Sequence, residues 1–323
     1  MTLPRKSLIS LHDTPFYHCV SRCVRRAFLC GTDHYSGQSY EHRRDWLESK
    51  LLATAEVFAI KLCSYAIMHN HYHVVLHVHS EIATNWTDLE VVTRWHQLFK
   101  GTWFSQRFAN GECLLKAEQH TLKRDIELWR SRLMDISWYM RIVNESIARK
   151  ANAEDQCTGR FWEGRFKSQA LLDDRALLSC MAYVDLNPIR AKLAKTPEDS
   201  DFTSIKCRIA KTQSKQRLPH SLERFDGIHE SSKGIPFKLK DYIELVDWTG
   251  RIIRKDKRGA IDSTLPPILE RIGLDAERWA ILSTEFEERF QHWVGSEHIV
   301  RKVCSDKAYQ RIPSINASRY LLN

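Results

Sequence analysis

The sequence predicts an α+β fold, in which an antiparallel β-sheet with packed helices is followed by a mainly helical C-terminal domain. Three observations lead to this prediction. Residues 71–79 alternate between apolar and mostly polar side chains, which is the period of a β-strand. Residues 41–58 and 174–187 carry apolar side chains at helical spacing. Residues 235–323 have a mostly helical pattern and follow a segment rich in turn-forming residues at 197–234.

The elements before and after the strand at 71–79 follow from local patterns. Residues 16–22 come after Pro15 and contain aromatic and β-branched side chains, so they predict a first strand. Residues 41–58 predict an amphipathic helix, and residues 88–108 and 121–152 predict further helices. Strands and helices are therefore expected to be mixed along the first part of the chain.

The strand at residues 71–79 is expected to be half-buried, with one mostly polar face. Side chains two residues apart on a strand point to the same side of the sheet. One side carries only apolar and aromatic residues: Tyr72, Val74, Leu76 and Val78. The other side carries four histidines and one valine: His71, His73, Val75, His77 and His79.

The histidine-rich face predicts a metal site. Alternate residues of a strand are about 6.5–7 Å apart, so two imidazoles at this spacing can converge on one cation. Two pairs compete, His71 with His73 and His77 with His79, and periodicity does not choose between them. An exposed polar strand face that happens to use histidine is the alternative. Zinc would prefer further His or Cys ligands, whereas magnesium or manganese would accept carbonyl, water and phosphate oxygens.

A tyrosine on the helix at residues 174–187 is a candidate nucleophile. Asp173 is placed to begin this helix, and Pro188 helps to end it. Tyr183 and Asn187 are four residues apart, so both project from one face. A tyrosine attacks once it has lost its proton, and since its ordinary pKa is about 10, a nearby cation would help. The alternative is an aromatic side chain that packs against the sheet.

Composition indicates a globular protein with an anionic partner. The chain has 323 residues, of which 43% are hydrophobic and 28% charged, and its formal net charge is +9. A basic balance favours nucleic acid, although good solubility alone would also account for it. The N-terminal segment has no continuous apolar stretch, and no window approaches 18 apolar residues. Neither a signal peptide nor a membrane span is therefore expected.

The nine cysteines are scattered and form no Cys-x-x-Cys pair. They are Cys19, Cys23, Cys30, Cys63, Cys113, Cys157, Cys180, Cys207 and Cys304. This spacing argues against a disulfide framework and against a four-cysteine zinc site. We therefore expect reduced thiols in a cytoplasmic protein.

Four segments, in order along the chain, resemble parts of a known family. They are FYHCVSRCVRR (16–26), IMHNHYHVVL (67–76), TGRFWEGRFKS (158–168) and YVDLNPIRA (183–191). The second resembles the metal-binding strand of single-tyrosine HUH transposases. The third and fourth resemble the Gly-Arg-aromatic segment and the nucleophile segment of REP-associated tyrosine transposases. The resemblance covers roughly residues 10–200.

The resemblance implies both a chemistry and a set of site residues. It makes His71 and His73 the metal-ligand pair, Tyr183 the nucleophile and Asn187 the third protein ligand. The metal would be Mg²⁺ or Mn²⁺, and the substrate would be single-stranded or hairpin DNA. The family links a DNA 5′-phosphate to the tyrosine and leaves a free 3′-hydroxyl, so rejoining needs no external energy source. The implied function is that of a DNA transposase and endonuclease.

The resemblance also implies a division of the chain. Residues 1–200 would form a ferredoxin-like HUH (palm-type) catalytic domain, residues 201–234 a linker or irregular segment, and residues 235–323 a helical C-terminal domain of unknown role. The sequence departs from the family pattern at His69, where the family usually has proline. The segment between the metal-binding strand and the tyrosine helix is also long.

Basic residues near the resembling segments are candidates for DNA contact. Guanidinium groups suit phosphate, and interleaved aromatic faces suit unstacked bases. The candidates are Arg22, Arg25, Arg26, Arg160, Arg165, Lys167 and Arg190. The alternative is that the neighbouring aromatic residues, Phe161, Trp162 and Phe166, belong to the core and the arginines are solvated.

Three other functions stay open at this point. A non-catalytic DNA-binding protein could keep the HUH fold as a scaffold. A metal hydrolase using activated water would keep its activity without Tyr183. A structural zinc protein would hold zinc with thiolate ligands. The sequence does not decide between a monomer and a homodimer, and we expect the protein in the bacterial cytoplasm, nucleoid-associated when bound to DNA.

Overall fold

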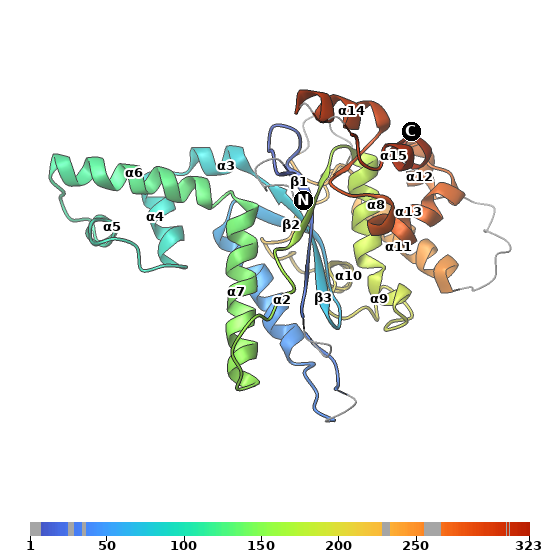
Figure 1. The fold of residues 1–323 in the computed structure, drawn as a ribbon, viewed down its shortest axis with the longest axis horizontal. Helices are drawn as coiled ribbons and strands as arrows, with labels where there is room; N and C mark the ends of the chain where they lie inside the picture. The colour runs from blue at the N-terminus through green and yellow to red at the C-terminus, as the bar shows by residue number, and fades with distance from the viewer. Residues whose placement is uncertain are drawn as a thin grey trace.

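The fold contains one five-stranded sheet with helices on both faces (Figure 1). A computed structural model describes residues 8–24, 29–33, 37–227, 233–254, 266–307, 309 and 311–323. The strands are β1 (Phe16–Arg22), β2 (Ile60–Ile67), β3 (His71–Val78), β4 (Lys167–Leu171) and β5 (Trp293–Val294), in the order β2-β3-β1-β4-β5. All neighbours pair antiparallel except β4 and β5, which are parallel. The predicted α+β class is confirmed at this level.

The helices occupy most of the remaining described chain. They are α2 (Arg43–Val57), α3 (Ser80–Asn85), α4 (Asp88–His96), α5 (Trp103–Ala109), α6 (Lys116–Arg132), α7 (Ile136–Glu154), α8 (Asp174–Asp185), α9 (Asn187–Arg190), α10 (Ser204–Gln213), α11 (Leu239–Arg254), α12 (Pro267–Arg271), α13 (Ala276–Arg289), α14 (Glu297–Asp306) and α15 (Ile315–Leu321). The predicted strand at 16–22 and the predicted helices at 41–58 and 174–187 are confirmed, with ends that differ by at most two residues.

Both faces of β3 are covered, so the expectation of a half-buried strand is wrong. Helices α2 and α7 pack together over one face, and α8 packs on the other (Figure 1). The apolar side chains Tyr72, Val74, Leu76 and Val78 belong to the cluster on the α2 and α7 side. Val75, from the histidine-bearing side, belongs to a second cluster with α8. The predicted alternation is therefore correct, but the second face is buried because other elements cover it.

Two predicted helices are each divided in two. The segment 88–108 forms α4 and α5, separated around Gly101, which has a φ of +72°. A positive φ is a conformation that glycine adopts without strain, so it suits the break. The segment 121–152 covers most of α6 and most of α7, and Asp135 caps α7 by accepting hydrogen bonds from its first turn. Helices α3 to α6 extend away from the sheet as an arm (Figure 1).

The C-terminal part of the chain contacts the same sheet and core. Strand β5 pairs with β4, and α13 packs against α8. One apolar cluster contains Leu177 and Met181 from α8 together with Trp279 and Leu282 from α13. The division of the chain at residues 201–234 stays a prediction, although described residues on its two sides share this sheet and cluster.

The predicted linker contains a helix with a buried arginine. Helix α10 lies within residues 201–234. The guanidinium of Arg208 is fully buried and donates hydrogen bonds to the carbonyl oxygens of Cys63 and Glu223. The bond to Cys63 ties the segment to β2. Among the described residues, no helix is both long and apolar enough to cross a membrane.

Candidate active site

Strand β3 and helix α8 bring His71, His73 and Tyr183 together. His71 and His73 lie on the same face of β3, and their ring centroids are 4.9 Å apart. The His73 and Tyr183 ring centroids are 5.9 Å apart in an edge-to-face arrangement. Strand periodicity sets the first relationship, and the packing of α8 on this face of the sheet sets the second.

The second histidine pair lies farther along the same face and meets a glutamate. The ring centroids of His77 and His79 are 4.0 Å apart. His77 Nδ1 and His79 Nε2 lie 2.7 Å and 2.5 Å from Oε2 of Glu223. These three side chains lie close enough together to hold a metal ion. Burial alone would raise the pKa of Glu223, but the hydrogen bonds from the two imidazoles hold it well below its usual value.

A chain of hydrogen bonds fixes the tautomer of His73. Gln169 Nε2 donates to the carbonyl oxygen of Phe290 over 2.8 Å, so its Oε1 is the acceptor toward His18 Nδ1, 2.7 Å away. His18 therefore carries its proton on Nδ1 and accepts at Nε2. His73 Nδ1 lies 3.0 Å from that atom and must donate to it. The lone pair of His73 is consequently on Nε2.

The Nε2 atom of His73 is buried and has no hydrogen-bond partner among the described residues. A buried polar atom without a hydrogen-bond partner destabilises the folded state, so we expect a bound group to occupy the lone pair of this nitrogen. The Nδ1 atom of His71 lies 2.6 Å from Asn70 Oδ1 and donates to it, which leaves His71 Nε2 with its lone pair. Two neighbouring imidazole lone pairs fit a divalent cation.

Both histidines are neutral near pH 7. Burial lowers the pKa of His71 to about 4, and the positive charge of Arg22 acts in the same direction. Burial lowers the pKa of His73 well below its ordinary value, with further contributions from His18 and His71. A metal would therefore not have to displace protons from these lone pairs.

Tyr183 is held in its protonated form by its surroundings. Its side chain is 8% exposed, and burial raises its pKa to about 12. The guanidinium of Arg190, 3.8 Å from the ring centroid, lowers the pKa, while Glu287 raises it. The Tyr183 hydroxyl donates to Glu287 Oε2 over 3.3 Å. A cation beside the hydroxyl would be needed to favour the phenolate.

Asn187, the expected third ligand, lies at the start of α9. It follows Leu186, the residue that ends α8, and Pro188 is the next residue. Its side chain is 8% exposed, and among the described residues it makes no hydrogen bond to either histidine. Leu186, which links α8 to α9, has helical backbone angles, so Asn187 still lies about one helical turn after Tyr183.

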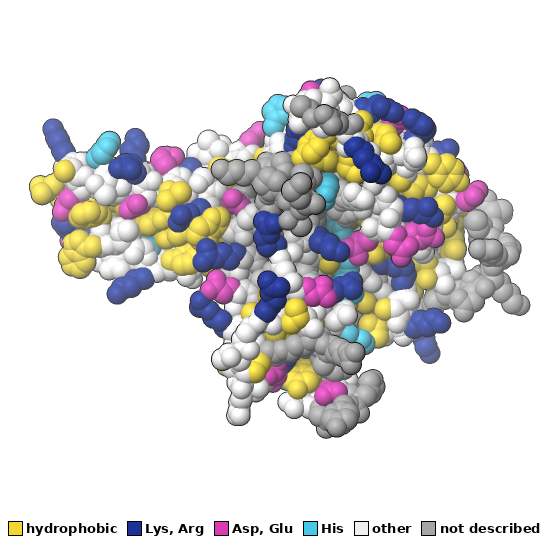
Figure 2. Space-filling view, viewed as in Figure 1, with side chains coloured by type: hydrophobic (Ala, Val, Ile, Leu, Met, Phe, Trp, Pro, Cys, Tyr) yellow, Lys and Arg dark blue, Asp and Glu magenta, His cyan; other side chains and the backbone are white. Residues whose placement is uncertain are grey.

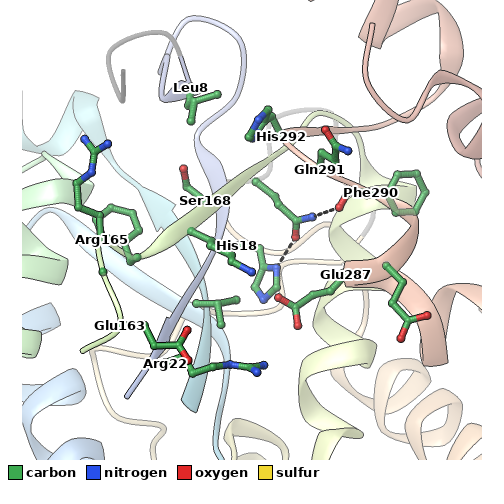
Figure 3. A pocket seen from close by; sticks show the side chains of 16 residues that line it. Leu8, His18, Arg22, Glu163, Arg165, Ser168, Glu287, Phe290, Gln291 and His292 are labelled. Atoms are coloured by element: carbon green, nitrogen blue, oxygen red, sulfur yellow. Dashed lines mark hydrogen bonds between the residues drawn. The ribbon is translucent and has the colours of Figure 1, made fainter. Parts of the chain in front are cut away.

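A cavity of about 720 Å³ opens beside His18 and Glu287 (Figure 3). Of the residues expected to contact DNA, Arg22, Arg165 and Lys167 line it. The view shows the Glu287 carboxylate pointing toward the His18 ring. On the face of the molecule shown in Figure 2, Lys and Arg side chains are spread widely instead of gathering at one end.

The other DNA candidates have different surroundings. Arg160 is exposed and donates to the carbonyl oxygen of Glu163, and it does not line the cavity. Arg190 donates to the carbonyl oxygens of Tyr183 and Ser283. Arg25 and Arg26 lie outside the described residues. The aromatic neighbours Phe161, Trp162 and Phe166 are buried in the core. This supports the alternative that they are core residues over the interpretation that they stack on DNA bases.

Sequence reasoning missed four side chains of these two sites: His18, Gln169, Glu223 and Glu287. His18 lies in a correctly predicted strand, and its presence on β1 was the only local signal. The register of β1 against β4 sets Gln169 directly opposite it. Glu223 and Glu287 come from segments far along the chain, where no local pattern marks them.

Comparisons with known proteins give one structural similarity. No family model and no curated protein matches the sequence. In structure, the chain is similar to a REP-associated tyrosine transposase solved with a bound REP hairpin. The two share 10% sequence identity, the match covers 72% of this chain and 97% of that chain, and the TM-score is 0.39. The similarity is to the family that the sequence segments resemble, but at this level it assigns no residue a role.

Proposed function

We propose that this protein is a metal-dependent single-stranded DNA endonuclease and strand transferase, with Tyr183 as its nucleophile. The contact between the rings of His73 and Tyr183 is the observation that carries the proposal. It gives the tyrosine a neighbour whose free lone pair can hold a cation. The second pair, His77 and His79, has its own acidic partner and no contact with Tyr183 among the described residues.

The strand order supports the finer fold assignment to a ferredoxin-like, palm-type HUH domain. The chain runs β1, α2, β2, β3, α7, β4, and its strands lie in the order β2-β3-β1-β4. This is the βαββαβ connectivity of the ferredoxin-like motif. The arm formed by α3 to α6 is then an insertion between β3 and α7.

The bound metal would be Mg²⁺ or Mn²⁺, and it would polarise the scissile phosphate and favour the phenolate form of the tyrosine. Nε2 of His71 and Nε2 of His73 would hold it, and the amide oxygen of Asn187 would be the third protein ligand. The remaining positions suit water and phosphate oxygens. His18 and Gln169 would keep the His73 lone pair directed at the ion.

The reaction would proceed by attack of the Tyr183 oxygen on a DNA phosphate. A bond forms between that oxygen and phosphorus, and the bond to the 3′-oxygen breaks, which leaves a 5′-phosphotyrosine and a free 3′-hydroxyl. Glu287, already the hydrogen-bond acceptor of the Tyr183 hydroxyl, would take its proton, and water would protonate the departing 3′-oxygen. Attack by a 3′-hydroxyl on the same phosphorus reverses the step and joins strands.

The DNA strand would approach along the cavity beside His18. Arg22, Arg165 and Lys167 supply positive charge along its wall, which suits phosphates. Arg25, Arg26, Arg160 and Arg190 are further candidates for DNA contact. The net charge of +9 is consistent with a polyanionic substrate such as a DNA hairpin.

A covalent-capture assay tests the proposal. The full-length protein would be incubated with a single-stranded hairpin DNA labelled on the 3′ side of the cut, with Mg²⁺ or Mn²⁺, and separated under denaturing conditions. A protein-linked label that needs metal, disappears in Tyr183→Phe and persists in Tyr320→Phe is the expected result. Tyr320 is an exposed tyrosine and serves as the matched control.

Two other outcomes would overturn the tyrosine mechanism. Metal-dependent cleavage that persists in Tyr183→Phe without an adduct would indicate a hydrolase that uses activated water. Metal-independent binding without cleavage, across hairpins of different sequence, would indicate a DNA-binding protein that keeps the fold as a scaffold.

A further inference from the structure

The second histidine pair forms a three-residue cluster with Glu223, in which His77 and Glu223 are buried and His79 is partly exposed. His77 belongs to β3, His79 immediately precedes α3, and Glu223 lies in the segment after α10. One carboxylate oxygen, Oε2, faces both imidazoles at 2.7 Å and 2.5 Å. The ligand-capable atoms of the three residues all lie within 4.8 Å of one another.

We propose that His77, His79 and Glu223 form a second metal site, which binds zinc and is separate from the site at His71 and His73. His77 is the fourth residue after His73 on β3, a distance of about 13 Å along the strand. One ion cannot bridge that separation. The cluster also has its own carboxylate, whereas the first pair lies beside Tyr183.

The donor set suits zinc. Two imidazoles and one carboxylate are a recurrent zinc ligand set, with water in the fourth position. The three donor atoms already face a common centre, because both ring nitrogens point at the same oxygen. Zinc would take the place of the two N–H hydrogens that face that oxygen, and each neutral ring would then carry its single proton on its other nitrogen.

Neighbouring groups hold the three ligands in place. The other oxygen of Glu223, Oε1, accepts the backbone N–H of Arg224 at 3.0 Å. The Glu223 carbonyl accepts from the buried guanidinium of Arg208 at 2.9 Å. The His77 ring stacks on Phe16 with centroids 4.2 Å apart. Contacts of this kind orient ligands and increase metal affinity.

Lys61 forms an ion pair with the carboxylate of the cluster. Its Nζ atom lies 3.8 Å from Glu223 Oε1, on the carboxylate oxygen that does not face the histidines. The lysine can therefore keep its partner while Oε2 binds the ion. This arrangement favours coordination through one carboxylate oxygen.

A zinc ion here would join the end of β3 to a segment more than 140 residues later in the chain. It would have a structural role, because the cluster lies away from Tyr183. Binding to the folded state alone raises the unfolding temperature in proportion to the logarithm of free zinc. The proposal does not depend on the DNA chemistry, and either can fail without the other.

Cobalt and zinc titrations of the full-length, chelator-stripped protein test the proposal. Cobalt in a low-symmetry site with nitrogen and oxygen ligands gives visible absorption bands, and zinc should displace it. We expect one such site in the wild type and in His71→Ala. In His79→Ala and Glu223→Gln we expect zinc affinity to fall by at least ~10-fold, the lower end of the loss seen when only a supporting residue is removed.

Thermal unfolding with and without zinc separates lost binding from lost folding. A zinc-dependent rise in the unfolding temperature should be present in the wild type and in His71→Ala and absent in His79→Ala, whose side chain is partly exposed and at the end of the strand. Absorption bands that disappear in His71→Ala but persist in His79→Ala would overturn the proposal. So would a wild-type protein that binds neither cobalt nor zinc at micromolar concentrations.

Discussion

The Nδ1 atom of His73 lies 3.0 Å from the Nε2 atom of His18, and this contact decides which nitrogen of His73 carries its lone pair. His18 is fixed in turn by Gln169, whose amide is oriented by the carbonyl oxygen of Phe290. The orientation therefore passes from the C-terminal part of the chain, through β4 and β1, to β3. A metal site on β3 would depend on residues that touch no metal.

Removing His18 should weaken metal binding at the first site. His18→Ala leaves the Nδ1–H of His73 without an acceptor, so the ring can change tautomer or turn. We expect the dissociation constant for Mn²⁺ to rise by ~10–100-fold, as for other partners of metal-bound histidines. Electron paramagnetic resonance titration of free Mn²⁺ measures this directly.

Three further variants make the His18 test specific. His18→Gln retains an acceptor and should restore part of the affinity. Gln169→Leu should act like His18→Ala, but more weakly. His120→Ala removes an exposed histidine and should change nothing. Equal Mn²⁺ affinity in His18→Ala and the wild type would show that the hydrogen bond is not needed for binding.

Asn187 and Glu287 should have separable effects. If Asn187 is the third ligand, Asn187→Ala should weaken Mn²⁺ binding by ~10-fold or more. If Glu287 takes the Tyr183 proton, Glu287→Gln should slow adduct formation by ~100-fold at saturating metal and leave Mn²⁺ affinity unchanged. The two are compared by Mn²⁺ titration and single-turnover adduct formation. Weaker Mn²⁺ binding in Glu287→Gln, with unchanged Mn²⁺ binding in Asn187→Ala, would indicate that Glu287 is the third ligand instead.

Phe286 should link the stability of the C-terminal helices to the site. Its fully buried ring lies 5.7 Å from the Tyr183 ring and 6.3 Å from the His18 ring, measured between centroids. Phe286→Ala should lower the free energy of unfolding by about 3–5 kcal/mol, and Phe286→Leu should lower it less. Urea unfolding measures both. Trp103→Ala, at a side chain 70% exposed, should cost within about 0.5 kcal/mol, and a similar cost for Phe286→Ala would contradict the packing described.

The end of α8 should make stability depend on pH through Asp185. Burial raises the pKa of this carboxyl from 3.8 to about 6, although hydrogen bonds from Tyr242 and Ser204 act in the opposite direction. The folded state therefore binds the proton more tightly than the unfolded state. Protonated Asp185 therefore adds to the free energy of unfolding. This stabilisation is fully present below about pH 4 and is lost as the pH rises through about 6, and the free energy of unfolding changes by about 3 kcal/mol in total.

Asp185→Asn isolates this contribution because asparagine does not titrate. The free energy of unfolding of the wild type minus that of Asp185→Asn should fall between about pH 4 and about pH 7 and stay level above it. Urea unfolding across this range gives the difference. A difference that is constant with pH, or that rises with it, would contradict the raised pKa.

Local periodicity was enough to predict much of the candidate site. The alternation along 71–79 correctly put four histidines on one face, because side-chain direction on a strand depends only on the strand's own backbone. The helix carrying Tyr183 was likewise predicted from its apolar spacing and its Asp173 cap. These features depend on neighbours within a few residues. The roles proposed for Tyr183 and Asn187 came from the family resemblance and stay predictions.

Contacts between distant segments were decided only by the tertiary structure. The sequence left two histidine pairs in competition, and the packing of α8 set Tyr183 beside His73, while the segment after α10 set Glu223 beside His77. The register of β1 against β4 brought Gln169 to His18. The burial of the histidine face was also missed, because burial depends on which layers cover a sheet. Periodicity fixes where a side chain points from its own strand or helix, and non-local packing and hydrogen bonding between elements determine what it meets.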